Sequence, residues 1–117
     1  MHKNLDVWQN SMHFVTALYE LTQQFPSDER FGLTNQIRRA CVSIPSNIAE
    51  GSARHSNKEF VQFLYIALGS ASEVETQLLI AKNLNYVHSI DPLYNDLQSI
   101  KRMLLGLIRS KQISKDS

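Results

Sequence analysis

The sequence predicts an all-α protein, an antiparallel up-down-up-down bundle of four helices. Apolar side chains recur every three or four residues along most of the chain, which is the period of an amphipathic helix. Only three prolines and four glycines interrupt this pattern, and strand signals are absent. The connections between the helical segments are short, which favours antiparallel neighbours.

The first helix is expected from about Leu5 to about Phe25, where Pro26 ends it. Its apolar stripe at helical spacing consists of Leu5, Trp8, Met12, Val15, Tyr19 and Thr22. A polar connection over Ser27–Gly32 follows, and the second helix opens at Leu33 and continues to about Ala53.

Ser56 is expected to begin the third helix, because Ser56 and Glu59 form the S-x-x-E capping box, in which each side chain bonds a backbone N–H of the helix start. The expected core stripe of this helix is Phe60, Phe63, Leu64, Ala67, Ala71, Val74, Leu78 and Ala81. Asp91 and Pro92 suit the N-cap and the first position of a fourth helix. Its stripe is Leu93, Leu97, Ile100, Leu104 and Leu107, and the polar tail from about Ser110 is expected to fray.

Length and composition set further bounds. The 117 residues make one domain, 1–117, with room for a single packed core. No apolar run approaches the ~20 residues that cross a bilayer, and nothing after Met1 resembles a secretory signal, so we expect a cytoplasmic protein without membrane contact. Cys41 is the only cysteine, which excludes an internal disulfide and suits a reducing compartment. The formal charge of +1 means that any basic surface must be local.

The second helix carries three distinct faces when each residue is placed at about 100° from the last. The core face is Ile37, Cys41, Ile44 and Ile48. A third face of small apolar groups consists of Val42, Pro45, Ala49 and Ala53. A monomeric bundle needs one apolar stripe per helix, so the extra face predicts a subunit contact, the alternative being that these small residues are simply exposed. Pro45 costs ~3 kcal/mol in a helix interior and predicts a kink or break.

A polar stripe lies between these two faces, and its members are candidates for a hydrogen-bonded network or a subunit interface: Gln36, Arg39, Ser43, Asn47 and Glu50, with Arg54 beyond them. A carboxylate and a guanidinium satisfy one another, which favours this interpretation over catalysis. Arg38 points about 100° away from Arg39, so we expect Arg38 to be the freer cation.

Common catalytic templates are absent. The sequence contains no Walker A loop, GxGxxG turn, HExxH pair or GxSxG elbow, and no glutamate is followed by histidine at the Glu-x-x-His spacing of di-iron bundles. The four histidines lack ligand spacing, and Cys41 lies on the core stripe, where a thiol is usually inert. We therefore expect no enzyme activity, no metal and no cofactor.

Candidate phosphate contacts are the cations Arg38, Arg54 and Lys58, with Arg30 at a connection, because such contacts need only accessible positive charge. A solvated surface is the alternative for a single protomer, whereas a ring would repeat each local charge into an extended patch. Several aromatic side chains would stack on bases if exposed, although helical spacing places most of them in the core: Trp8, Tyr19, Phe60, Phe63 and Tyr65.

The chain resembles the four-helix bundle family encoded in intervening sequences of bacterial large-subunit ribosomal RNA genes. The similarity runs from about Leu5 to Ile108 and includes the opening LDVWQ, the Phe25-Pro26 stop, FGLT at Phe31–Thr34 and the block QIRRACVSIPSNIAEG at Gln36–Gly51. It continues through Lys58-Glu59-Phe60 to Gln77-Leu78.

This resemblance implies assembly as a homopentamer. Relatives include the accessory proteins of diversity-generating retroelements, which resemble RNA-binding partners of a reverse transcriptase and are strongly basic, whereas this chain is nearly neutral. Many members have no assigned activity. The leading expectation is a non-enzymatic oligomer that binds RNA, a ribonucleoprotein or a nucleic-acid-processing protein. The alternative is a protein-interaction scaffold, which the near-zero net charge favours.

Overall fold

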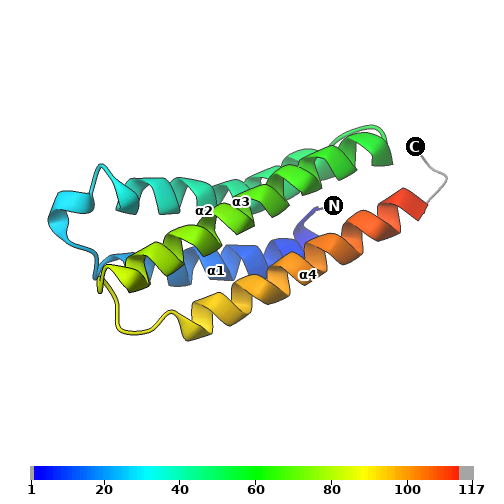
Figure 1. Ribbon diagram of the computed structural model, residues 1–117. Coiled ribbons are helices and arrows are strands. Elements are labelled where there is room, and N and C mark those ends of the chain that lie inside the picture. Colours follow the sequence, from blue (N-terminus) through cyan, green and yellow to red (C-terminus); the bar gives the residue numbers. More distant parts are fainter. Residues whose placement is uncertain (1, 114–117) are drawn as a thin grey trace.

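Four α-helices make up most of residues 2–113, the part of the chain that the computed structural model describes (Figure 1). They are α1 (Asp6–Thr22), α2 (Leu33–Ser52), α3 (Asn57–Asn83) and α4 (Asp91–Ile113), with short 3-10 turns at His2–Asn4 and Ser27–Glu29. No strand occurs within these residues. The predicted all-α class is therefore confirmed.

Each helix packs against the helix before and after it in the sequence, and α1 also packs against α4. Figure 1 shows the helices alternating in direction along an elongated bundle that measures 48 × 24 × 20 Å. The α2–α3 connection, the start of α1 and the last turn of α4 lie at one end. The α1–α2 and α3–α4 connections lie at the other.

The core is built from the apolar stripes predicted for three of the helices. Ile37, Cys41, Ile44 and Ile48 of α2 are each 0% exposed, as expected. On α3 the predicted stripe is buried except for Phe63, which is half-buried. On α4 the stripe is confirmed up to Leu104, and Ile108 rather than Leu107 completes it.

The predicted face of α1 is confirmed only in part, because Thr22 is buried and Leu5, Trp8 and Val15 are partly buried against the core. The buried side chains are Val7, Ser11, Phe14, Leu18 and Thr22, whereas the predicted Met12 and Tyr19 are exposed. Two apolar stripes lie about 100° apart on this helix, and the one facing the bundle contains two hydroxyls. Each hydroxyl donates to a carbonyl of its own helix, Ser11 to Trp8 at 2.8 Å and Thr22 to Tyr19 at 3.1 Å, so both are buried with a hydrogen-bond partner.

The helix boundaries follow the sequence signals with small differences. The helix expected to reach Phe25 ends at Thr22, and turn hydrogen bonds carry the chain to Pro26. The Glu59 amide donates to the Ser56 hydroxyl at 3.2 Å, which confirms Ser56 as the N-cap of α3. The reciprocal bond of the capping box, from the Ser56 amide to the Glu59 side chain, is not found among residues 2–113. Helix α2 is continuous through Pro45, which excludes the break, one of the two outcomes predicted there; the kink stays a prediction. Helix α4 continues beyond Ser110 to Ile113, and the rest of the tail, 114–117, lies outside the described residues.

Candidate nucleic-acid and subunit interfaces

A polar seam joins α2 to α3. The Asn47 side-chain amide donates to both the carbonyl and the hydroxyl of Ser43, each at 2.8 Å, and the Ser70 hydroxyl donates to the Ser43 hydroxyl at 3.0 Å. Two of the five predicted network residues are thus brought together, and Ser70 of α3 is a partner that the sequence did not indicate. Small hydroxyl side chains suit this position because they let two helix backbones approach closely.

The charged residues of the same stripe go elsewhere. Glu50 pairs with Arg54 one turn later, at 3.5 Å, and both side chains are exposed. Arg39 lies about 16 Å along the helix from Glu50, too far for an ion pair within one chain. Arg39 is exposed and, with Gln36, lines a shallow groove of about 340 Å³ that also includes Glu73 of α3.

Arg38 is not the freer of the two adjacent arginines, and that prediction is wrong. Its Nε donates to the Thr22 hydroxyl at 2.8 Å and its Nη2 to the Tyr19 carbonyl at 3.3 Å. Its guanidinium also lies 4.6 Å from the centre of the Tyr19 ring. These contacts hold Arg38 against α1. The freer cation is its neighbour Arg39, for which no hydrogen bond or ion pair is found among residues 2–113.

Two of the predicted phosphate contacts, Arg54 and Lys58, lie together at the α2–α3 connection and the first turn of α3. His55 follows Arg54 in the connection, and Lys111 of α4 lies against the same surface. We name Arg54, His55, Lys58 and Lys111 the basic end. Lys111 falls in the segment that the sequence predicted to fray, and only the antiparallel packing of α4 on α3 brings it beside residues distant in the chain.

Arg30 lies at the opposite end of the bundle, away from Arg54 and Lys58. Its guanidinium is 5.8 Å from the ring centre of Phe31, whose side chain is 86% exposed. The connection that carries both residues is held by Glu29, which accepts from the Tyr86 hydroxyl at 2.6 Å and from the Leu33 amide at 3.0 Å. The Tyr86 hydrogen bond, followed by the Leu33 amide, lowers the pKa of the Glu29 carboxyl below its usual value.

An apolar groove runs between α1 and α2 on the outside of the bundle. Its volume is about 380 Å³. The side chains that line it are His2, Trp8, Met12, Val15, Val42, Pro45, Ser46 and Ala49. Three residues of the stripe predicted on α1, Trp8, Met12 and Val15, therefore meet the third face of α2 here. Ala53 of that face lies outside the groove. We name this surface the α1–α2 groove.

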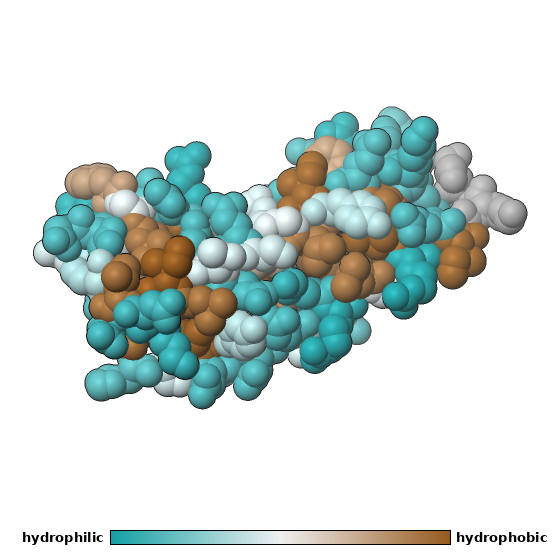
Figure 2. Space-filling model, in the orientation of Figure 1, coloured by the Kyte–Doolittle hydropathy of each residue, from teal (hydrophilic) through white to brown (hydrophobic). Residues whose placement is uncertain are grey.

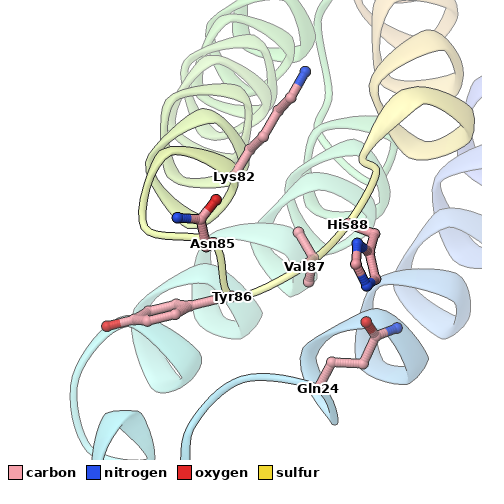
Figure 3. Close-up of a pocket in the computed structure, with 6 residues that line it drawn as sticks. All are labelled: Gln24, Lys82, Asn85, Tyr86, Val87 and His88. Atoms are coloured by element: carbon pink, nitrogen blue, oxygen red, sulfur yellow. The ribbon is translucent and has the colours of Figure 1, made fainter.

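A hollow of about 600 Å³ lies between the end of α1 and the α3–α4 connection (Figure 3). Figure 3 shows that its side chains diverge: the Tyr86 hydroxyl points away on one side and the Lys82 amine on another, while His88 and Gln24 face one another. Polar groups that diverge in this way do not form the convergent set that a small-molecule site needs.

The Cys41 thiol is fully enclosed in the core, and burial raises its pKa to about 12. A thiol that keeps its proton and lacks access to solvent is a packing group. Within residues 2–113, no three His, Cys, Asp or Glu side chains are grouped as metal ligands, and no helix is both long and apolar enough to span a bilayer.

These features define a four-helix bundle with a polar seam between its second and third helices, an apolar groove outside the first two, and a basic end. The chain belongs to the family of 23S rRNA-intervening sequence proteins, whose model matches residues 3–106. A similar solved structure is a protein with unknown function of the S23 ribosomal protein family from Bacteroides thetaiotaomicron. It is 28% identical, the match covers 93% of this chain and 99% of that one, and the TM-score is 0.82. No curated protein matches the chain.

Proposed function

We propose that this chain is a non-enzymatic, cytoplasmic helical bundle that assembles with copies of itself and binds RNA or a ribonucleoprotein through its basic end. The observation that carries the proposal is the grouping of Arg54, His55, Lys58 and Lys111 on one end of the bundle. The family description links its members to intervening sequences of 23S rRNA, which supports an RNA context.

The distribution of charge supports this proposal in spite of the net charge of only +1. The opposite end carries many of the acidic side chains, namely Glu20, Asp28, Glu29, Asp91 and Asp96. Arg30 and Lys82 also lie at that end, and Glu50 and Glu59 lie near the basic end, so the charge of the nearly neutral chain is only partly polarised along its long axis. Phosphate contacts depend on local cations, and a ring would place the basic ends of all its subunits on one rim.

Assembly is supported by two separate apolar surfaces on one chain. The first is the α1–α2 groove. The second consists of exposed apolar side chains on α3, Ile66 and Ile80, and of Leu84 at its C-cap, which are 51%, 41% and 51% exposed. Figure 2 shows hydrophobic surface over both halves of α3. Two different apolar surfaces favour a heterologous, head-to-tail contact, which closes into a ring, over a two-fold dimer that uses one surface twice.

Solution mass tests the assembly. The wild-type chain should elute as a multiple of its 13.4 kDa mass, with the homopentamer as the expected species. Val42→Glu in the groove and Ile80→Glu on α3 should each lower that mass, because each would bury a charge in an apolar contact. Asn95→Glu, on the exposed surface of α4, is the matched control and should leave the mass unchanged. A wild-type chain that stays a monomer at micromolar concentration contradicts the proposal.

RNA binding is tested by fluorescence anisotropy with a labelled RNA that contains both paired and unpaired segments. Affinity should fall steeply with added salt, and Arg54→Ala and Lys58→Ala should each weaken binding and reduce the salt slope by about 1. Arg30→Ala, at the other end of the bundle, is the matched control. Binding that is undetectable or indifferent to salt rejects this function.

A protein-interaction scaffold is the second candidate, and the exposed Phe31 favours it. A phenylalanine that is 86% exposed on a connection held by the Glu29–Tyr86 hydrogen bond is suited to enter an apolar pocket on another protein. A protein partner that co-purifies after nuclease treatment, and that Phe31→Ser releases, would rank this function first. Recovery that nuclease abolishes would instead favour RNA.

A further inference from the structure

Two hollows flank the start of α3 at the basic end, and they share Asn57 and Lys111 in their walls. The first, of about 270 Å³, lies on the side of the α2–α3 connection and includes Arg54 and His55. The second, of about 390 Å³, lies between α3 and the last turn of α4 and includes Lys58 and Tyr65. The two hollows lie on either side of Asn57 and Lys111, and we name the surface that they form together the α3–α4 groove.

The charge of this groove has one sign. None of the residues that line either hollow is acidic, whereas arginine, histidine and lysine side chains line both flanks. Glu50 approaches from outside the groove and meets Arg54 at 3.5 Å, with both partners exposed. An exposed pair of this kind contributes little, so Arg54 keeps most of its attraction for a phosphate.

Aromatic rings hold two of the cations in place. The Arg54 guanidinium lies 4.7 Å from the ring centre of Phe63, and the Lys111 amine lies 5.7 Å from that of Phe60. A cation held over a ring face has fewer conformations to lose on binding than a side chain in open solvent. The two positive charges are therefore positioned before any ligand arrives.

Tyr65 provides a surface for a base. Its side chain is 49% exposed and lies in the same hollow as Lys58, with the amide side chains of Gln62 and Gln112 beside it. No hydrogen bond or ring contact involves the Tyr65 side chain among residues 2–113. A base with its face free can stack on such a ring, and side-chain amides can bond its edge. Tyr65 also lies about 100° around α3 from Ile66, so the two side chains point in different directions from the helix axis.

We propose that the α3–α4 groove binds a short single-stranded stretch of RNA, with one base stacked on Tyr65 and the flanking phosphates at Lys58, Lys111 and Arg54. The inference rests on the RNA-binding function proposed above and specifies its target. A duplex keeps its bases stacked and paired, so it can use the cations but not the tyrosine ring. The groove therefore selects unpaired RNA over paired RNA of the same sequence.

The test compares the full chain on a labelled single-stranded RNA and on the duplex of the same sequence, by anisotropy at one salt concentration. Tyr65→Leu should weaken single-strand binding about 5- to 100-fold and leave duplex binding unchanged, whereas Tyr65→Phe should restore the wild-type affinity. Phe31→Leu, a second exposed aromatic at the far end, is the matched control. Circular dichroism checks that each variant is folded.

The outcomes separate this inference from the function on which it rests. If Lys58→Ala weakens binding but Tyr65→Leu does not, RNA binding stands and the single-strand groove is overturned. Equal affinity of the wild-type chain for both RNAs overturns it as well. If neither RNA binds, both the function and the groove are rejected.

Discussion

Gly51 is the residue at which a single methyl group best tests the packing of the bundle. It lies near the end of α2, is buried, and faces the first turns of α3. A Cβ added there would lie 2.7 Å from the Phe63 Cβ, 2.8 Å from the Phe60 Cδ1 and 3.2 Å from the Phe60 carbonyl oxygen. The Phe63 Cβ is bonded to the backbone, so α2 and α3 would have to separate to accept the methyl group.

The magnitude follows from two opposing effects. Replacing glycine by alanine inside a helix stabilises it by about 1 kcal/mol. Carbon atoms in contact prefer about 3.5–4.0 Å, so the clash requires a shift of about 1 Å, and overpacking of this kind costs roughly 1–3 kcal/mol. The net expectation for Gly51→Ala is a loss of about 0–2 kcal/mol. Gly106 has no such neighbour within 4 Å, so Gly106→Ala keeps the helix gain of about 1 kcal/mol.

Urea unfolding followed by circular dichroism at one protein concentration measures both variants. Gly106→Ala should raise the midpoint and Gly51→Ala should not, and the two midpoints should differ by about 0.5–1.5 M, given a slope of about 2 kcal/mol per M. If Gly51→Ala raises the midpoint as much as Gly106→Ala does, the close approach of α2 and α3 at this glycine is wrong.

Three further predictions use the same assay. Arg38→Ala should lower the free energy of unfolding by about 1–2 kcal/mol, because it removes the hydrogen bonds to the Thr22 hydroxyl and the Tyr19 carbonyl. Arg39→Ala should stay within about 0.5 kcal/mol of wild type. Equal effects of the two substitutions would refute the assignment of Arg38 to packing. The Glu29 pKa is lowered in the folded state, so the contribution of Glu29 to stability is present above the unfolded pKa, near 4.5, and is lost as pH falls through the lower folded pKa. Glu29→Gln should therefore lose less stability than wild type between about pH 5 and about pH 3. Identical curves of stability against pH for the two proteins would contradict this. Ser56→Ala should cost about 1 kcal/mol through loss of the α3 cap, while Ser110→Ala, on the exposed face of α4, should be nearly neutral.

The sequence predicted the helices well because their signals are local. The Ser56 cap, the Pro26 stop and the Asp91-Pro92 start act within one turn of the chain, and each lies at an observed helix boundary or within a few residues of it. The core stripe of α2 was also predictable, since only one of its faces carries large aliphatic side chains. The resemblance to a known family, which the family model confirms, rested on the same local motifs.

The candidate sites depended on contacts that local patterns do not encode. On α1, two apolar stripes differ by one residue step, and the sequence alone favours the stripe that contains Trp8 and Met12. The stripe that is buried instead contains the Ser11 and Thr22 hydroxyls. Their burial is tolerated because each hydroxyl donates to a carbonyl of its own helix. The stripe that contains Trp8 and Met12 lines the α1–α2 groove instead.

The amino-acid sequence by itself determined where helices begin and end and which family the chain belongs to, because caps, prolines and the helical period act over a few neighbouring residues. Only the tertiary structure decided that Arg38 packs against α1 while Arg39 is exposed, and that Lys111 joins Arg54 and Lys58 in one groove. The physical reason is that helical phase sets a direction around one axis, whereas a site needs the relative positions of several axes, which the packing of the whole core determines.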